Sequence, residues 1–349
     1  MQFNTLIILD IIPDIRPLEA IVSKSRRVVA VSHFKPDGDA VGSLTACCNY
    51  LRSRGVDVTP VLPSPLAEYL QFVAEGSGLL IFQDDEDAVN AAIAAADTII
   101  CLDFSGLSRT EYLQEQIGAS KAVKVLVDHH ASQDASEFDL VYASTEVSST
   151  CELLFWLLMQ MPDVAGDVSR LGMDVVNPLY VGMMTDTNNF SNSVSPSTFE
   201  MGAALLRRGV DKNALQFAVL NNHSEPRMRL MGHLLKDKMQ IVDGYDAAYM
   251  VLTAEEKQQY SFKSGDSEGL VNMPLTIAGI RISAFFTECP DDGYIRVSLR
   301  SRPGTDVNAL ARAYFNGGGH VNAAGGRLWL KPEDVPAYFL KSLQEFFGK

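Results

Sequence analysis

Short runs of β-branched residues alternate with helical patterns over the first two hundred residues. The runs cover residues 28–32, 56–61, 98–102 and 123–127. Strands this apolar, each bounded by polar loops, predict a parallel sheet that is covered on both faces. Between the first two runs, one apolar stripe indicates a helix that ends before Gly55, formed by Val41, Leu44, Cys48 and Leu51. We therefore expect a doubly wound α/β domain with a mainly parallel sheet.

Helical patterns follow the predicted sheet. Residues 153–158 are apolar all round, which predicts a buried helix. Asn177 and Pro178 favour the start of a shorter helix that runs to Met184. The pattern from about residue 198 to 237 is mainly helical and charged, and Ser224 is an expected helix start. We interpret these residues as a connector between two domains.

The last third of the chain has strand and turn signals. Residues 280–286 and 295–299 alternate in polarity around the turn residues 290–293, which predicts an antiparallel hairpin. A helix over 306–315, a glycine loop, a strand near 327–330 and a closing helix complete a smaller α+β domain with a mixed or antiparallel sheet. The expected boundaries are 1–205 for the first domain, 206–238 for the helical connector and 239–349 for the second domain.

Net charge limits the partners of this chain. Its 349 residues include 43 acidic and 29 basic side chains, a formal charge of −14 at pH 7. So anionic a protein has no broad basic face for a long polyanion, which excludes a nucleic-acid scaffold. We expect a phosphate-bearing ligand to bind locally, through metal ions or a small basic pocket.

The cysteines and apolar segments indicate a cytoplasmic protein. Five cysteines, odd in number and without regular spacing, fit neither a disulfide framework nor a zinc knuckle. The apolar stretch from Leu6 to Ile12 is short, contains Asp10 and lacks a basic segment before it, so no signal peptide is expected. The longer apolar runs fall below the ~18 residues that span a bilayer, and no membrane partner is expected.

An imidazole and two carboxylates follow the first predicted strand. His33, Asp37 and Asp39 lie within seven residues, where Gly38 and Gly42 allow a tight loop. Ligand sites of open α/β sheets lie at the carboxyl ends of strands, and such a loop offers ligands for a hard divalent cation. An Asp- and Gly-rich turn with a helix cap explains this loop about equally well.

Three further apolar segments end in Asp or His. Asp103 follows the third strand and taken alone is more typical of a helix cap. Asp128, His129 and His130 follow the fourth strand, and two adjacent imidazoles beside a carboxylate are costly to order unless something coordinates or protonates them. Asp186 follows another apolar segment, which is the fourth segment to end in Asp or His. Caps alone do not require histidines at two of the four ends.

The ligand types predict two divalent ions. Carboxylates and imidazoles without thiolates suit Mn²⁺, Mg²⁺, Co²⁺ or Fe²⁺ better than structural zinc, and the histidines favour Mn²⁺ over Mg²⁺. Five or six ligands are too many for one ion that keeps open positions for water. Two ions ~3.5 to 4 Å apart with a shared carboxylate would use them all and lower the pKa of bound water toward ~7, which is the chemistry of phosphoester or anhydride hydrolysis.

A compact basic segment lies in the second predicted domain. Residues 296–331 contain six Lys or Arg and one Asp, a local charge of +5. Alternation along the hairpin strand places Arg296, Ser298 and Arg300 on one face, and Ser301 continues the strand. Three glycines, Gly317, Gly318 and Gly319, precede His320 and predict a backbone nest for an anion. A flexible glycine turn with an exposed histidine is the alternative.

These residues, in their order along the chain, resemble the motifs of the DHH phosphoesterases that carry a C-terminal DHH-associated domain. These enzymes belong to a superfamily that includes the RecJ-like exonucleases. The resemblance covers nearly the whole chain and is greatest to the oligoribonuclease and 3′-phosphoadenosine-5′-phosphate phosphatase group. The first four motifs contain His33 to Ser43, Asp103, Asp128 to His130, and Asp186. The associated domain's motifs resemble residues 268–272, 298–301 and 317–320 with the following Ala-Ala-Gly-Gly.

The resemblance implies residue roles. One ion would be held by His33, Asp37 and Asp103, and a second by Asp39, Asp103, His129 and Asp186. It implies that His130 contacts the scissile phosphate, where an imidazolium would stabilise developing charge. Asp128 is expected to act in catalysis by orienting a neighbouring histidine. The substrate-binding residues would be Asn272, Arg300, Ser301, Gly317, Gly318, Gly319 and His320, and the family relationship implies a homodimer through the N-terminal domain.

The expected activity is metal-dependent hydrolysis of short oligoribonucleotides, of the 3′-phosphate of phosphoadenosine phosphate, or of both. A cyclic-di-AMP phosphodiesterase is the alternative with the same motifs. A polyphosphatase or pyrophosphatase would share the first four motifs but not the second domain's nucleotide motifs. A catalytically inactive nucleotide-binding module would lack a metal ligand, and every expected ligand is present. After Asp186, Asn188 and Asn189 precede the aromatic Phe190 where relatives often have a glycine and a serine, which leaves the preferred substrate open.

Overall fold

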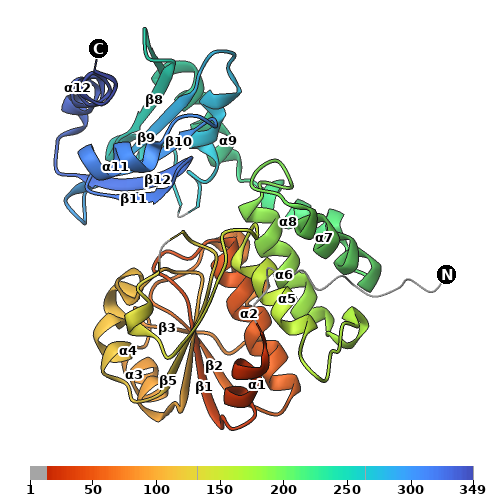
Figure 1. The fold of residues 1–349 in the computed structure, drawn as a ribbon. Coiled ribbons are helices and arrows are strands. Elements are labelled where there is room, and N and C mark those ends of the chain that lie inside the picture. The colour runs from red at the N-terminus through yellow and green to blue at the C-terminus, as the bar shows by residue number, and fades with distance from the viewer. Residues whose placement is uncertain (1–13, 132, 264, 349) are drawn as a thin grey trace. The chain divides into compact units, whose positions relative to one another are not determined.

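The computed structural model describes residues 14–131, 133–263 and 265–348 (Figure 1). The apolar stretch from Leu6 to Ile12 lies outside these residues. The chain divides into two compact units, Met1–Asn222 and His223–Lys349, and each is considered by itself. No helix within the described ranges is long and apolar enough to cross a membrane.

The first unit contains a six-stranded parallel sheet with the order β3-β2-β1-β4-β5-β6. The order reverses between β1 and β4, so the doubly wound prediction is confirmed. Strands β3 and β6 were not predicted. The bounds are β1 (Arg27–Val31), β2 (Asp57–Leu62), β3 (Leu80–Ile81), β4 (Thr98–Leu102), β5 (Val123–Asp128) and β6 (Leu140–Ala143).

Helices cover both faces of this sheet (Figure 1). Side chains of β1 point alternately to the two layers: Ala30 belongs to one apolar core, while Val29 and Val31 belong to the other. The first core includes residues of α1 (Arg16–Val22), α2 (Gly38–Ser53), α5 (Thr150–Met159) and α6 (Met173–Asp186). The second includes residues of α3 (Glu86–Ala95) and α4 (Gln114–Ala119).

Two helices of the first core test sequence predictions. Every residue of α5 is buried, as expected from its apolar pattern. The prediction that a helix starts at Asn177 and Pro178 is wrong, because α6 begins at Met173 and contains Pro178. Pro178 has no N–H for the carbonyl of Asp174, and that carbonyl accepts a hydrogen bond from Asn49 Nδ2 at 2.8 Å instead. A partner 125 residues away thus allows the proline inside the helix.

Helices α2 and α6 pack closely along their length. A Cβ atom on Gly42 would lie 2.5 Å from the carbonyl oxygen of Pro178, so a larger residue does not fit. The start of α2 lies against the end of α6, where a Cβ on Gly38 would collide with Thr185. The carboxylates before and within the first turn of α2 are therefore brought close to Asp186, the last residue of α6.

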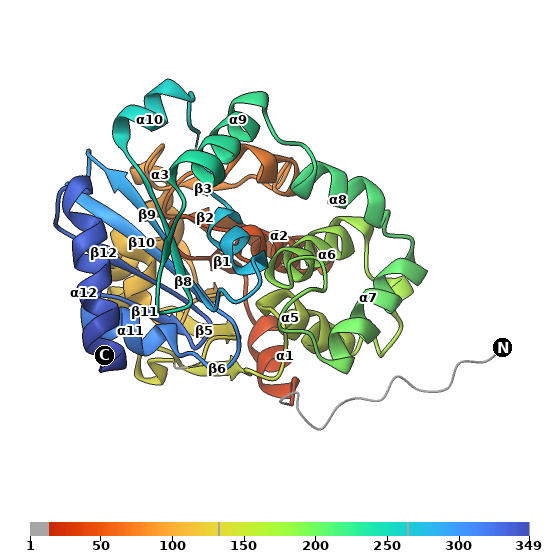
Figure 2. The same ribbon diagram turned by 90° about the horizontal axis from the view of Figure 1, so that it is seen from above.

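A helical region follows α6. It contains α7 (Pro196–Arg208) and α8 (Lys212–Leu220) in the first unit and α9 (Glu225–His233) in the second. Figure 2 shows α5, α6 and α7 gathered on one side of the first sheet. Ser224 caps α9 by accepting a hydrogen bond from the amide of Arg227, as predicted. The units divide between Asn222 and His223, within the expected connector.

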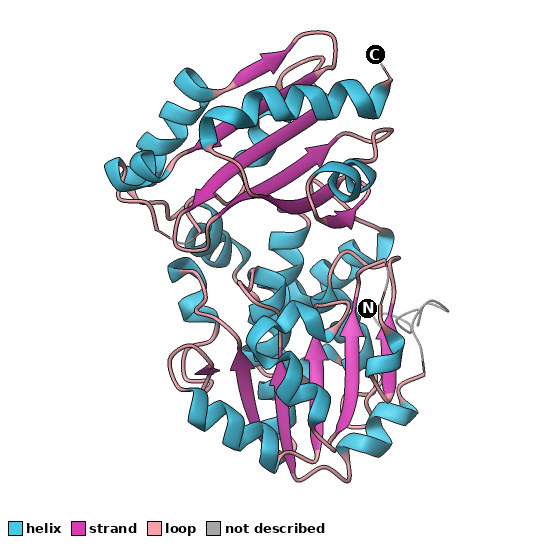
Figure 3. Cartoon of the chain, turned by 90° about the vertical axis from the view of Figure 1, so that its left-hand side faces the viewer, coloured by secondary structure: helices cyan, strands magenta, loops and turns pink. Residues whose placement is uncertain are grey.

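The second unit contains a mixed six-stranded sheet with the order β11-β12-β10-β9-β8-β7 (Figure 3). Strands β8 and β9 are parallel, and the other neighbouring pairs are antiparallel. The predicted hairpin is β9 with β10. The strands are β7 (Gln240–Val242), β8 (Ala247–Leu252), β9 (Ile282–Cys289), β10 (Tyr294–Ser301), β11 (Gly318–His320) and β12 (Ala323–Leu328), and the further helices are α10 (Ala254–Gln259), α11 (Val307–Tyr314) and α12 (Val335–Phe347).

The predicted glycine loop is wrong: Gly318–His320 form β11, an edge strand that pairs with β12. The predicted strand near 327–330 also starts earlier, at Ala323. Glycine is needed because the backbones approach closely. A Cβ on Gly319, whose φ is +149°, would lie 2.6 Å from the carbonyl oxygen of Ala323, and one on Gly317 would collide with that of Gly325.

Candidate metal centre

The sequence-predicted ligands of the first unit meet at the point where the strand order reverses. His33 and Asp103 follow the neighbouring strands β1 and β4, and Asp128 is the last residue of β5. The crevice beyond the carboxyl ends of such strands is the usual ligand site of doubly wound sheets. The start of α2 and the end of α6 add the carboxylates of Asp37, Asp39 and Asp186.

One ligand group consists of His33, Asp37 and Asp103, whose ligand atoms all lie within 4.8 Å of one another. His33 Nε2 is 3.6 Å from an oxygen of Asp103 and 4.0 Å from an oxygen of Asp37. His33 Nδ1 lies 3.0 Å from the carbonyl oxygen of Phe34. A carbonyl only accepts, so Nδ1 carries a proton, and Nε2 is the ring nitrogen that faces the carboxylates and would bind a metal.

The second ligand group consists of Asp39, His129 and Asp186, again with ligand atoms within 4.8 Å of one another. His129 Nε2 is 3.3 Å from Asp186 Oδ2 and 4.0 Å from Asp39 Oδ2. It also lies 3.6 Å from Asp103 Oδ1. Two ligands about 2.1 Å from one ion lie about 3.0 to 3.4 Å apart, so small side-chain shifts would close either group around a divalent cation.

Asp103 belongs to the first group and also faces the second group. Its Oδ2 faces His33 and its Oδ1 faces His129. The residue is 2% exposed and has a φ of 67°, a conformation that non-glycine residues seldom adopt. Burial alone would raise the pKa of Asp103, but its contacts with His33 and His129 lower that pKa well below the usual value. An ionised carboxylate is therefore held between the two groups.

Asp39 is fully buried and accepts hydrogen bonds from the first turn of α5. The amide of Thr150 donates to Oδ2 at 2.6 Å, and the amide of Cys151 donates to Oδ1 at 2.9 Å. Burial and the nearby carboxylates of Asp103 and Asp37 raise the pKa of Asp39 well above its usual value. A cation is the partner that this concentration of buried negative charge requires.

His130 lies beside the two groups and contacts Asp128. Its Nδ1 is 2.6 Å from Asp128 Oδ1, and Gln133 Nε2 donates to the other carboxylate oxygen at 3.0 Å. Burial lowers the pKa of His130, but the contact with Asp128 and the charges of Asp103 and Asp128 together outweigh it, so the net pKa is raised. The pKa of His129 is lowered, mainly by burial. The two adjacent imidazoles therefore differ in the direction of their pKa shifts, which favours the protonated ring at His130 and the neutral, metal-binding ring at His129.

The predicted substrate residues lie in the second unit. Arg300 on β10 is opposite Ala323 on β12, which is opposite His320 on β11. Directly opposed residues share a face, so Arg300 and His320 flank the small side chain of Ala323. The next row on this face consists of Ser298, Gly325 and Gly318, which leaves the surface low between the two larger side chains.

Other predicted substrate residues have structural contacts. The Ser301 hydroxyl is on the buried face of β10, donates to the carbonyl of Thr305 and accepts from Asn322. The amide of Gly317 donates to Ala311, and that of Gly319 donates to Asn308 Oδ1. The amides therefore do not converge as the predicted nest. Asn272 is partly exposed on the 3₁₀ helix η6 (Leu270–Thr276).

The sequence analysis missed the residues that support the centre. Thr150 Oγ1 donates to Asp103 Oδ1 at 3.0 Å, and the fully buried Glu152 accepts from both helix α7 and the residues before α5. A signal was present, because Ser149 and Glu152 before an apolar run have the spacing of a capping box.

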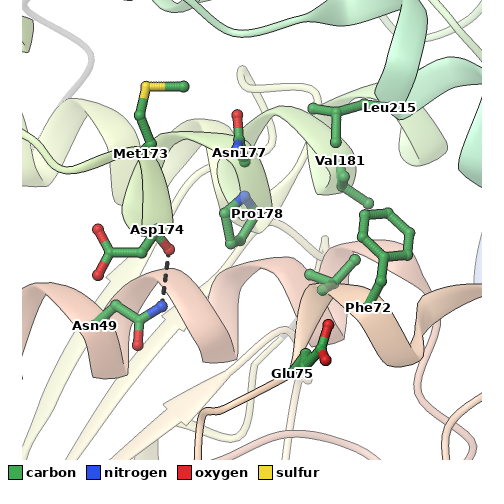
Figure 4. A pocket seen from close by; sticks show the side chains of 10 residues that line it. Asn49, Phe72, Glu75, Met173, Asp174, Asn177, Pro178, Val181 and Leu215 are labelled. Carbon is green, nitrogen blue, oxygen red and sulfur yellow. Dashed lines mark hydrogen bonds between the residues drawn. The ribbon is translucent and has the colours of Figure 1, made fainter.

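A separate pocket of about 260 Å³ lies among α2, α6, α8 and the 3₁₀ helix η1 (Glu68–Val73) (Figure 4). Its walls include Phe72, Pro178, Val181 and Leu215, and the Asn49 to Asp174 hydrogen bond crosses one side. None of the predicted site residues lines it, so the chemistry is assigned to the strand ends and not to this pocket.

The fold and the ligand groups agree with comparisons to known proteins. Residues 27–183 match the N-terminal domain of the DHH family, and residues 246–349 match the DHHA1 domain. The chain therefore belongs to the DHH family of phosphoesterases, as the motif resemblance predicted.

Two characterised relatives are similar over most of the chain. The bifunctional oligoribonuclease and PAP phosphatase NrnA of Thermus thermophilus is 25% identical over 307 residues, which cover 86% of this chain and 84% of NrnA. The cyclic-di-AMP phosphodiesterase PdeA of Listeria monocytogenes is 23% identical over 320 residues, which cover 89% of this chain. They cover 46% of PdeA, so this chain spans about half of that relative.

Solved structures have the same fold. An exopolyphosphatase-related protein from Bacteroides fragilis has a TM-score of 0.88 and 33% identity, with 95% of this chain and 96% of that chain covered. RecJ in complex with Mn²⁺ from Thermus thermophilus has a TM-score of 0.59 and 14% identity, with 98% of this chain and 55% of RecJ covered. At that identity the second likeness concerns the fold alone.

Proposed function

We propose that this protein is a two-metal phosphoesterase that hydrolyses short oligoribonucleotides, the 3′-phosphate of phosphoadenosine phosphate, or both. The observation that carries the proposal is the pair of His and carboxylate ligand groups joined by Asp103. Carboxylate and imidazole ligands suit Mn²⁺, with Mg²⁺ or Co²⁺ as substitutes. When bound, two such ions supply a hydroxide nucleophile near neutral pH and stabilise charge on the phosphate.

The chain's own residues would position the substrate and supply a proton donor. Asp128 accepts from His130 Nδ1, orients the ring and raises its pKa, so that a protonated Nε2 would donate to a phosphate oxygen as negative charge develops. Arg300 and His320 would bind a second phosphate of the ligand, over the low surface formed by Ala323 and Gly325.

The similarity to NrnA along most of both chains supports these substrates. A cyclic-di-AMP phosphodiesterase is the second candidate, and the similarity to PdeA supports it. Cyclic-di-AMP and a linear dinucleotide both carry two phosphates, so the ligand groups alone do not separate the two candidates.

The test is Mn²⁺-dependent hydrolysis of a labelled RNA dinucleotide, phosphoadenosine phosphate and cyclic-di-AMP in parallel, with Asp103→Ala as the control. We expect rapid hydrolysis of the dinucleotide, of phosphoadenosine phosphate, or of both, and none by the variant. Hydrolysis of cyclic-di-AMP alone would favour the second candidate. Nucleotide binding without hydrolysis of any of the three would contradict both.

A further inference from the structure

Glu152 is a fully buried carboxylate in the first turn of α5. All of its hydrogen-bond partners donate to it: the Ser148 amide at 2.8 Å and hydroxyl at 2.6 Å, Trp156 Nε1 at 3.5 Å, Ser197 Oγ at 2.5 Å and Thr198 Oγ1 at 2.8 Å. A buried charge is costly unless it is hydrogen-bonded. Here five donors converge on two oxygens, and two of them, the Ser148 amide on Oε2 and Trp156 Nε1 on Oε1, cannot accept, so in either orientation an amide side chain would place its own N–H group against a donor.

This network fixes the start of α5. The Ser149 hydroxyl accepts the amide of Glu152 at 3.0 Å, and Glu152 in turn accepts the amide of Ser148. The amides of Thr150 and Cys151, the first two residues of α5, both donate to Asp39. The direction in which the Asp39 carboxylate points is thus set by the first turn of α5.

The same carboxylate fixes the start of α7. Ser197 and Thr198 lie in the first turn of this helix, and both donate to Glu152. The loop that ends at α7 begins directly after Asp186 and contains three consecutive residues with positive φ, Asn188 to Phe190. Glu152 therefore anchors the far end of the segment that leaves Asp186.

The first ligand group also contacts α5, because Thr150 Oγ1 donates to Asp103 Oδ1, the oxygen that faces His129 of the second group. The loop that carries His33 has different supports. The amide of Phe34, next to His33, donates to the carbonyl of Arg109, and the amide of Lys35 donates to Ser64 Oγ. Neither contact involves Glu152. Two of the three members of the second group are linked to Glu152 through such segments. Asp39 accepts from the first turn of α5, and Asp186 precedes the loop that ends at α7.

We propose that Glu152 is a positioning residue for the second ligand group, Asp39, His129 and Asp186, and that it sets the affinity of this group for its divalent ion without touching the ion or the substrate. The proposal rests on the two-metal centre of the proposed function. Side chains that orient metal ligands typically change affinity ~10- to 100-fold when they are replaced.

The experiment is calorimetric titration of Mn²⁺ into the metal-free full chain, wild type and Glu152→Gln. The wild type is expected to bind two ions, and the variant to bind one of them at least tenfold more weakly while the other changes less than threefold. Asp37→Asn and Asp186→Asn, each combined with Glu152→Gln, leave one group intact and identify which ion is affected.

Glu256→Gln is the matched control. Glu256 is also the third residue of a capped helix and accepts from the cap amide and hydroxyl of Thr253, but it lies in the second unit. We expect this variant to bind both ions as the wild type does, even if its thermal midpoint falls as much as that of Glu152→Gln.

Equal weakening of both ions, or no change in either, in folded Glu152→Gln would overturn the positioning role. If that variant does not fold, Ser197→Ala removes one donor from α7 and is expected to weaken the same ion about threefold; unchanged binding overturns the proposal. A wild type that binds fewer than two ions would overturn the proposed centre itself, which separates the two failures.

Discussion

Asp103 has a backbone conformation that few residue types tolerate, at the position where both ligand groups require an oxygen. Asparagine keeps the size of the side chain and its tolerance of positive φ, but removes the charge. Asp103→Asn is therefore expected to lose both Mn²⁺ ions and to lower hydrolysis by about a thousandfold or more.

Asp37→Asn is the comparison for this prediction, since Asp37 belongs to the first group alone. It should lose one ion and retain the other in the same calorimetric titration. Tight binding of one ion by Asp103→Asn would show that the carboxylate is not shared.

Glu256 gives a pH prediction in the second unit. Burial alone would raise the pKa of Glu256, but Lys238, the amide of Thr253 and His233 lower it to about 2 from 4.5. A carboxyl whose pKa is lowered on folding stabilises the protein above its unfolded pKa, and this contribution is lost as the pH falls. In urea unfolding, the difference in unfolding free energy between wild type and Glu256→Gln should shrink between pH 4.5 and about 2. A constant difference over that range would contradict the linkage.

At the scale of elements, the contact between α2 and α6 sets the distance between the carboxylates at their ends. Gly42→Ala places a methyl group 2.5 Å from the carbonyl of Pro178, which is backbone and yields little. We expect a loss of about 1 to 3 kcal/mol in unfolding free energy, typical of overpacking. Gly232→Ala on α9 is the control, because nothing lies within 4 Å of its Cβ position; it should be neutral or stabilising by up to about 1 kcal/mol. Equal effects in chemical denaturation would contradict the packing argument.

The same elements show what sequence reasoning can reach. Strands β1, β2, β4 and β5 were predicted because their apolar runs are local signals, and the family motifs lie at their ends. Strands β3 and β6 have two and four residues, too few for a pattern. The true start of α6 depends on Asn49, far away in sequence, and the pairing of β11 depends on close backbone approach at Gly317 and Gly319. Such long-range contacts leave no periodic signal.

The predicted metal ligands do come together in the structure, in the two groups around Asp103. They were predictable because each lies at the end of an apolar segment or in a family motif. The network of Glu152 was missed because two of its donors, Ser197 and Thr198, lie about 45 residues further along the chain in α7, although the Ser149 and Glu152 spacing was visible. The metal ligands were therefore easier to predict from sequence than the buried residues, such as Glu152, that hold them in place.

At the scale of the whole molecule, we propose a division in which hydrolysis depends on the ligand groups of the first unit and nucleotide affinity on the basic strand of the second. Arg300→Ala is expected to raise KM for a nucleotide substrate about tenfold or more, the size of a lost charged hydrogen bond, with little effect on hydrolysis of a small aryl phosphate. Lys341→Ala on α12 is the control, since this helix packs on the other face of the second sheet. Equal losses by Arg300→Ala on both substrates would contradict the division.

Anomalous diffraction from crystals of this protein grown with Mn²⁺ would locate the two ions that we propose share Asp103. We expect two peaks, each about 2.1 Å from an Asp103 oxygen, one beside His33 and the other beside His129. A single peak, or two peaks of which one does not contact Asp103, would contradict it.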